Sequence, residues 1–297
     1  NGDIARVRQH WHADWGQPPE TILNGSHKYA DGRLHDAAAS LGANVTHLDW
    51  QWNYAAGVHH WKPRKPSHGL SLVPPKSALW LNWRGERIGP MPLVTGFDTH
   101  DLVAQICRQE RGYSWQLLNR RIALKELAVS GSEFNPAFRD KKMLAVARDM
   151  LRGNRWLYAQ LTQNCPDFVV ADSLPALVGK MNTLVGDGSV RLDAVTEAAV
   201  RYDERIAAGP RFHNDDQLRR IEFARRGTGD RLGTCKFQAS LDPKAGPLIA
   251  IREFIISRKS MGGLQTDLSS RVLDHGGQPI AGLYAAGESA GFGGGGM

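Results

Sequence analysis

The chain has 297 residues, a formal net charge of +7, 41% hydrophobic residues and 23% charged residues. This balance supports a buried core and excludes a disordered chain, and the length suggests about two domains. Its longest apolar runs, such as residues 248–251, are far too short to span a bilayer. Because Lys and Arg are spread along the chain and form no stripe, we expect no nucleic-acid partner.

The cysteines Cys107, Cys165 and Cys235 lie too far apart for a metal motif or a disulfide framework. Reduced thiols in a cytoplasmic protein fit this spacing. The first residues, 1–4, also lack the basic and apolar pattern of a signal peptide. We therefore expect a cytoplasmic protein, or a natural start that precedes Asn1.

Four amphipathic segments, each with a capping residue, predict helices. Their first turns begin at Asp31, Asp98, Ser173 and Asp193. The predicted inward-facing side chains are, in chain order, Leu34, Ala37, Ala38 and Leu41; Leu102, Val103 and Ile106; Leu174, Leu177, Val178 and Met181; and Val195, Ala199, Tyr202 and Ile206.

Predicted strands gather in two places. Leu79–Leu81 and Arg87–Ile88 flank a turn at Arg84–Gly85 and predict a hairpin, and Pro247–Ile256 predicts a strand buried on both faces. Short strands are then expected at 263–267, 270–273 and 282–286, before a glycine-rich tail at 291–296. Such a turn normally leads into a helix, so we expect the natural chain to continue past Met297.

The segment Gly287–Gly291 matches the G-x-S-x-G elbow of serine hydrolases. That fold needs an acid and a histidine after the serine, and residues 292–297 contain neither. A hydrolase would have to take both from chain beyond Met297. The alternative interpretation of Ser289 is a tight turn of small residues.

Gly291, Gly293 and Gly296 match G-x-G-x-x-G, the dinucleotide fingerprint. The fingerprint also needs a following helix and a later acidic residue, for which this chain has no room. These glycines therefore predict a backbone surface suited to a flat ligand, without a complete Rossmann motif.

Histidines occur close together at His59–His60 and at His10 and His12. No cysteine or carboxylate lies beside them at helical or hairpin spacing, so we predict surface histidines and no metal site. Five tryptophans crowd one stretch, namely Trp50, Trp52, Trp61, Trp80 and Trp83. They predict core and lid packing or, alternatively, a non-catalytic module that binds a flat aromatic or carbohydrate ligand.

The predicted buried strand closes with Arg258, Lys259 and the pair Gly262–Gly263. Two cations beside a Gly-Gly bend are compatible with a solvated loop. They are equally compatible with an anion or oxyanion clamp above a glycine floor.

The C-terminal segment resembles the closing segment of the fumarate reductase and 3-ketosteroid dehydrogenase flavoprotein superfamily. The match rests on M-G-G-L-Q-T-D at 261–267 and I-A-G-L-Y-A-A-G-E at 280–288. Segments 31–43, 81–87, 171–177 and 195–209 resemble earlier parts of the same family in the same order. The closest subgroup is the FAD-binding dehydrogenases.

The resemblance implies an α/β to α+β fold in three parts. These are an FAD-domain remnant at 1–47, a substrate or cap domain at 48–262 and a C-terminal FAD-domain segment at 263–297. It also implies that the Rossmann-like dinucleotide unit precedes Asn1. On this basis we expect the chain by itself to be inactive and not to retain FAD.

By the same resemblance, the protein transfers hydride between FAD and a small organic substrate. The implied catalytic residues are Arg258 and Lys259, and the implied substrate-binding residues are Gly262 and Gly263. The residues implied to face FAD are Ala286, Gly287, Glu288, Gly293 and Gly294.

Three departures from the family prevent assignment of either named reaction. Fumarate reductases place an arginine proton donor where this chain has 95–98, and a histidine where it has Arg258. Ketosteroid dehydrogenases carry a tyrosine where this chain has Ile249.

Overall fold

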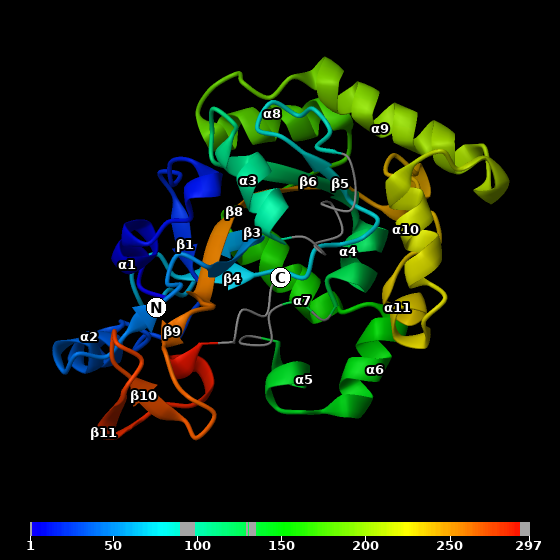
Figure 1. Ribbon diagram of the computed structural model, residues 1–297. Coiled ribbons are helices and arrows are strands. Elements are labelled where there is room, and N and C mark those ends of the chain that lie inside the picture. The colour runs from blue at the N-terminus through cyan, green and yellow to red at the C-terminus, as the bar shows by residue number, and fades with distance from the viewer. Residues whose placement is uncertain (1, 90–98, 129, 131–134, 292–297) are drawn as a thin grey trace.

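The computed structural model describes residues 2–89, 99–128, 130 and 135–291, which form a mixed α/β fold (Figure 1). Gly293 and Gly294 of the predicted flavin-facing set lie outside these residues, as does Asp98, the predicted start of the second helix.

A seven-stranded sheet forms the centre of the larger part of the molecule. Its strands are β1 (Ile22–Asn24), β3 (Gln51–His59), β4 (Gly69–Ser71), β5 (Leu79–Leu81), β6 (Tyr113–Asn119), β7 (Phe168–Ala171) and β8 (Leu248–Ser260). The order is β4-β3-β8-β6-β5, and β1 and β7 also pair with β8. The pairing of β1 with β8 is parallel, and the other strand pairings of this sheet in the described part of the chain are antiparallel.

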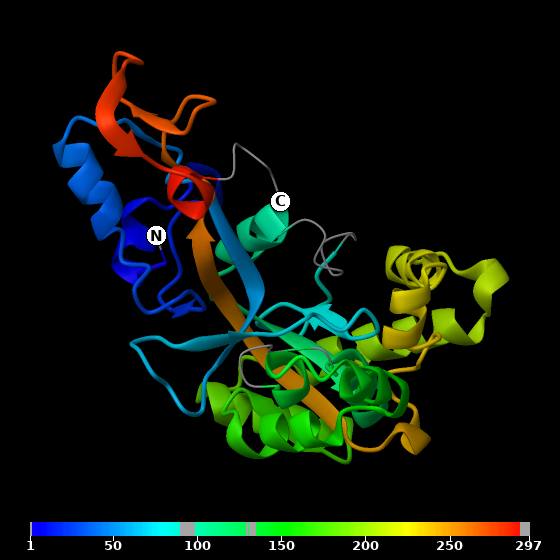
Figure 2. The ribbon, with the colours of Figure 1, turned by 90° about the horizontal axis from the view of Figure 1, so that it is seen from below.

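Strand β8 connects the whole fold. Its first half pairs with β6 and β7, and its second half pairs with β3 and β1. The predicted strand ended at Ile256, but the pairing with β3 carries β8 on to Ser260. Figure 2 shows β8 running from the helices at one end of the molecule toward residues 263–291 at the other.

Helices cover both faces of the sheet. They are α1 (Ile4–Gln9), η1 (Ala13–Trp15), α3 (Thr99–Cys107), α4 (Arg120–Glu126), α5 (Pro136–Arg139), α6 (Met143–Arg152), α7 (Arg155–Asn164), α8 (Leu174–Val185), α9 (Leu192–Ala207), η3 (Pro210–Phe212), α10 (Asp216–Ala224), α11 (Thr228–Gly233) and η4 (Pro243–Ala245). Successive β8 side chains alternate between the two faces of the sheet and enter three cores. Ala250 and Phe254 pack with α8, α9 and α10, whereas Ile251 packs with α4 and α7, and Ile255 with η1 and α3.

All four predicted helices are present, and the predicted inward faces of three of them are confirmed. The Ser173 hydroxyl caps α8, and the four side chains predicted to face inward there are buried. Helix α3 buries the predicted Leu102, Val103 and Ile106. Helix α9 begins at Leu192, one residue before the predicted Asp193, and buries its predicted face except for Ile206, which is half-buried.

The predicted inward face of the first helix is right for Ala38 and wrong for its two leucines. Helix α2 (Arg33–Ser40) buries His35 and Ala38, while Leu34 and Leu41 are 65% and 66% exposed. The hydrophobic pattern placed both leucines inward, but the side of α2 that packs into the small core carries His35 and Ala38.

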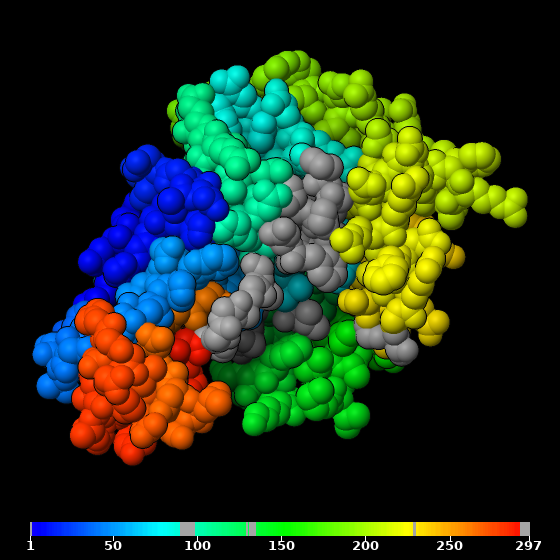
Figure 3. Space-filling view, in the orientation of Figure 1, coloured from blue at the N-terminus to red at the C-terminus, as the bar shows by residue number. Residues whose placement is uncertain are grey.

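A small unit brings distant parts of the chain together. It contains α2, β2 (Val45–Thr46), β9 (Gly263–Leu264), β10 (Arg271–Leu273), β11 (Pro279–Tyr284) and the turn η5 (Gly287–Ala290). Its core consists of Ala38, Ala43, Leu264, Val272 and Ala285. Figure 3 shows these N-terminal and C-terminal segments side by side at one end of the molecule. Residues 4–24 instead join the large sheet, and the domain boundaries at 47 and 262 stay a prediction.

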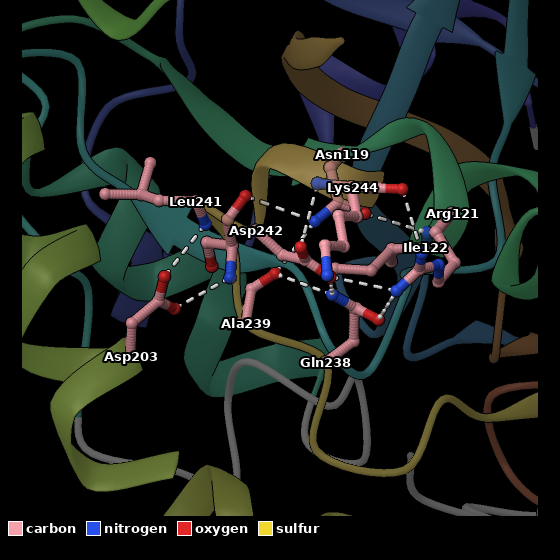
Figure 4. Close-up of polar contacts among 10 residues, drawn as sticks. Asn119, Arg121, Ile122, Asp203, Gln238, Ala239, Leu241, Asp242 and Lys244 are labelled. Atoms are coloured by element: carbon pink, nitrogen blue, oxygen red, sulfur yellow. Dashed lines mark hydrogen bonds and ion pairs between the residues drawn. The ribbon is translucent and has the colours of Figure 1, made fainter. Parts of the chain in front are cut away.

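A polar network fixes the loop that leads into β8 (Figure 4). The Asn119 amide donates to the carbonyls of Ala239 and Ser240, and its oxygen caps α4 by accepting from the Ile122 backbone N–H. From α9, the Asp203 carboxylate accepts the backbone N–H groups of Ser240 and Leu241 at 2.7 and 2.8 Å. The loop is thereby anchored to two helices before the chain enters β8.

Cys107, Cys165 and Cys235 are all described, and all three are free thiols, as the spacing predicted. Among the helices of the described residues, none is long and apolar enough to cross a membrane.

Candidate functional site

The candidate site lies just after the end of β8, where Gly263 packs against the backbone of the turn η5. A Cβ atom on Gly263 would lie 2.4 Å from the Ser289 carbonyl oxygen and 2.8 Å from the Gly291 nitrogen. One on Gly262 would lie 2.0 Å from the Thr46 carbonyl oxygen. Both glycines predicted to bind substrate are therefore required for backbone packing, and their contact with substrate stays a prediction.

The turn predicted to face FAD presents its backbone outward. Ala286, Gly287 and Glu288 are all exposed. Gly287 has φ +63°, and no other part of the chain lies within 4 Å of the position that a Cβ atom would occupy there. The segment thus offers an open backbone surface, and its contact with FAD stays a prediction. Of the glycines predicted to lie against a flat ligand, Gly293 and Gly296 lie outside the described residues.

Helix α2 holds this turn in place. The Nε2 of His35 lies 2.9 Å from the Ser289 carbonyl oxygen. Burial lowers the pKa of the His35 imidazole and favours its neutral form. Since a carbonyl can only accept, the proton is on Nε2, and the buried Nδ1 has no hydrogen-bond partner among the described residues.

Ser289 is not part of a catalytic dyad in the described structure. Its hydroxyl donates to the Ala286 carbonyl at 3.1 Å, and His35 contacts the Ser289 backbone and not its side chain. An activated serine would need a base within reach of its hydroxyl. The serine hydrolase alternative therefore finds no support.

Arg258 and Lys259, as neighbours on a strand, point to opposite sides of β8. Arg258 is exposed, with its Cδ beside Gly25. The Lys259 ammonium lies 4.9 Å from the ring centroid of Trp52 on β3. The two cations therefore do not converge on a single anion, and the catalytic role of each stays a prediction.

The tryptophan-rich stretch does not form one binding platform. Trp80 and Trp83 are 1% and 8% exposed and belong to two different cores. Trp50 is 47% exposed, and its carbonyl accepts the Met261 backbone N–H at 2.6 Å. The packing interpretation is confirmed for Trp80 and Trp83, and the alternative of a ligand-binding module finds no support.

The expectation of surface histidines is wrong for His12 and His60, each of which is 9% exposed. His60 stacks on His68, with ring centroids 4.4 Å apart. His12 caps η1 through its Nδ1 and lies near Asp14 and His100. The prediction that no carboxylate lies beside these histidines is also wrong, because Asp14 follows His10 by four residues and His12 by two. No sequence spacing connects this segment to His100.

Sequence reasoning also missed Glu253, which is fully buried at the middle of β8. Neither carboxyl oxygen has a hydrogen-bond partner in the described part of the chain. Burial, followed by the nearby charge of Asp167, raises the pKa of Glu253 well above its ordinary value. Burial therefore favours the neutral carboxylic acid over the carboxylate in the folded protein.

The chain belongs to the FAD binding domain family, whose model matches residues 16–297. It is 41% identical to a KsdD-like steroid dehydrogenase of Mycolicibacterium smegmatis and 39% identical to one of Mycobacterium tuberculosis. Both matches cover 100% of this chain, but 54% and 52% of the relatives. The chain thus spans about half the length of these relatives.

Two solved structures share the fold. A 3-ketosteroid delta1-dehydrogenase from Sterolibacterium denitrificans matches 97% of this chain and 46% of its own, with a TM-score of 0.58 at 16% identity. A flavocytochrome c3 fumarate reductase in an open conformation matches 98% of this chain and 39% of its own, with a TM-score of 0.55 at 17% identity. The resemblance predicted from the C-terminal motifs is therefore confirmed at the level of the family.

Proposed function

We propose that this chain is part of a flavin-dependent oxidoreductase that transfers hydride between FAD and a small, steroid-like ketone. The observation that carries the proposal is the crossing of Gly262–Gly263 over the open turn at 286–291 in a chain of the FAD binding domain family. The steroid class is supported by the names of relatives about 40% identical over the whole chain. A cytoplasmic location, in keeping with three free thiols, is part of the proposal.

The residues present fit a flavin. Ala286, Gly287 and Glu288 present an exposed backbone on which the flat ring system can lie, and no side chain occupies the space beside Gly287. FAD, when bound, supplies the atom that exchanges hydride with the substrate. The chain's own contribution is to hold this turn through His35 and to close it against β9 through Gly263.

The end of β8 would meet the substrate. Trp50, whose backbone carbonyl accepts the Met261 N–H, presents a half-exposed indole, which suits an apolar ring system. Arg258, exposed at the same end of β8, offers the forked donors that stabilise a carbonyl oxygen as it gains negative charge. An apolar wall and a cationic donor together match a rigid ketone.

The chain of residues 1–297 should not retain FAD by itself. Dinucleotide-binding units are built from parallel strands joined by helices. The one parallel strand pairing among the described residues, β1 with β8, has no such unit around it. A yellow preparation with one equivalent of flavin would contradict this part of the proposal.

The test uses the protein at the full length of its relatives. It should carry an oxidised flavin spectrum, and anaerobic mixing with a saturated 3-ketosteroid should bleach the flavin band. Succinate, offered in parallel, should leave the band unchanged. A colourless full-length protein would overturn the flavoprotein proposal, whereas bleaching by succinate alone would overturn only the steroid class.

A further inference from the structure

Two histidines and an aspartate from distant segments meet beside the aromatic residues of the N-terminal region. His12 precedes η1, Asp14 lies within η1, and His100 lies in the first turn of α3. One ligand atom of each side chain lies within 4.8 Å of the other two. His12 Nδ1 is 3.8 Å from the Asp14 carboxylate, and His100 Nε2 is 4.0 Å from it.

The two elements that carry these residues are fixed to each other by Trp15. This side chain is 2% exposed, and its indole N–H donates to the His100 carbonyl at 3.0 Å. The Trp15 ring also packs on both imidazoles, with centroid distances of 5.5 Å to His12 and 5.0 Å to His100. The backbone segments that carry the three potential ligands are therefore held close together before any ion binds.

We propose that His12, Asp14 and His100 form a binding site for a divalent transition-metal ion such as Zn²⁺. Two imidazoles and one carboxylate form a donor set that such ions prefer over Mg²⁺ or Ca²⁺. In a tetrahedral zinc site, ligand atoms at the usual bond lengths lie about 3.3 Å apart. The present separations need to shrink by only about half an ångström to one and a half ångströms.

Two of the three side chains can move to make this adjustment, and the third is fixed by its burial. The Asp14 side chain is 73% exposed and that of His100 is 35% exposed, whereas that of His12 is 11% exposed between Trp15 and Trp50. Asp14 and His100 can thus close on an ion that His12 anchors. The His12 Nδ1 lone pair now accepts the Asp14 backbone N–H at 3.2 Å, and coordination would replace that long hydrogen bond.

This inference does not depend on the proposed function, because the site uses no flavin and lies entirely within the present chain. It adjoins the candidate site, since Trp50 contacts both imidazoles with its ring and the Met261 backbone with its carbonyl.

The test is a titration of the EDTA-treated chain 1–297 with Co²⁺, followed by visible absorption and by quenching of tryptophan fluorescence, and then displacement by Zn²⁺. One equivalent should bind. Because outer-shell changes alone weaken metal sites about 10- to 100-fold, loss of a direct ligand in His100→Gln or Asp14→Asn should weaken binding at least about 10-fold. Both positions are solvent-accessible, so near-UV circular dichroism should show an intact fold.

His275→Ala removes an exposed histidine in the β10–β11 turn and should bind Co²⁺ like the wild type. The proposal is overturned if the wild-type chain binds no stoichiometric Co²⁺. It is equally overturned if His100→Gln and Asp14→Asn bind it as tightly as the wild type does.

Discussion

The imidazole of His35 donates from Nε2 to the carbonyl of Ser289, and so ties helix α2 to the turn predicted to face the flavin. The two residues are far apart in sequence, and the bond joins the first and last parts of the described chain. Burial lowers the pKa of His35, so the folded state favours the neutral ring.

This relationship predicts a pH dependence of stability. Because the folded pKa lies below the ordinary value of 6.5, the unfolded chain takes up the proton first as pH falls. Stability from this group is complete at pH 8 and declines as pH falls through the region of 6.5 and below, by at most about 1.4 kcal/mol per pH unit. His35→Gln keeps a donor to Ser289 but cannot titrate, and should flatten the decline.

Urea unfolding of the wild type and His35→Gln at pH 8, 7, 6 and 5 measures the effect. His275→Gln, at an exposed histidine, is the matched control and should follow the wild type. If the curves of wild type and His35→Gln stay parallel across this range, the buried neutral ring is not the cause.

A second prediction contrasts two glycines. Gly263→Ala places a methyl group 2.4 Å from the Ser289 carbonyl oxygen, so backbone must move, and overpacking of this kind costs about 1–3 kcal/mol of stability. Gly179 lies exposed inside α8 with open space at its Cβ position. Gly179→Ala should stabilise the protein by about 0.5–1 kcal/mol, because alanine favours a helix over glycine.

The same urea unfolding experiment reports both variants. An unchanged Gly263→Ala would show that the crossing of β9 over η5 is looser than the structure has it, and would weaken the candidate site itself.

Local signals in the sequence predicted the elements whose formation does not depend on a particular packing partner. Helix α8 followed from a Ser173 cap and an apolar stripe, and β8 followed from an apolar run that any sheet would bury on both faces. Strand β3 was missed because Gln51–His59 mixes polar, aromatic and small residues and carries irregular pairing with β8. The leucines of α2 were misplaced because periodicity marks an apolar face without telling what covers it.

The candidate site was predictable only in part, for the same reason. The Gly262–Gly263 bend and the turn at 286–288 stood out as short motifs, and the structure brings them together. The contacts of His35 with Ser289, and of His12 with His100, join residues that no local spacing relates. The sequence likewise could not show that the Glu253 carboxyl group has no hydrogen-bond partner in the described part of the chain, because this depends on how both faces of β8 are packed.

Glu253 provides a third prediction, with the opposite sign to His35. Its folded pKa is raised above the ordinary value of 4.5, so the unfolded chain releases the proton first as pH rises. The wild type should lose stability as pH rises above 4.5, with a slope from this group of at most about 1.4 kcal/mol per pH unit. Glu253→Gln, a neutral isostere, should therefore gain stability relative to wild type at pH 8 and match it near pH 4.5.

Unfolding of wild type and Glu253→Gln at pH 5, 6.5 and 8 measures this difference, with exposed Glu204→Gln as the control. A Glu253→Gln variant that is equally destabilised at every pH would show instead that the carboxylate is ionised and paired.

The last prediction concerns Arg258 in the protein at the full length of its relatives, and rests on the proposed function. Arg258 is exposed at the end of β8, beside the bend at Gly262–Gly263, so its removal leaves no buried partner unpaired. Loss of a preorganised donor to a developing oxyanion slows a reaction about 100- to 1000-fold. Arg258→Ala should slow flavin reduction by that factor, with flavin content and Tm unchanged.

Arg155→Ala, at an exposed arginine of α7, is the control and should reduce flavin at the wild-type rate. Stopped-flow absorbance of the flavin band with a 3-ketosteroid measures each rate. A rate in Arg258→Ala within a few-fold of wild type, or one that falls only with loss of flavin or a lower Tm, would show that Arg258 has a structural role. Lys259, which lies over the Trp52 ring, would then be the next candidate for the donor.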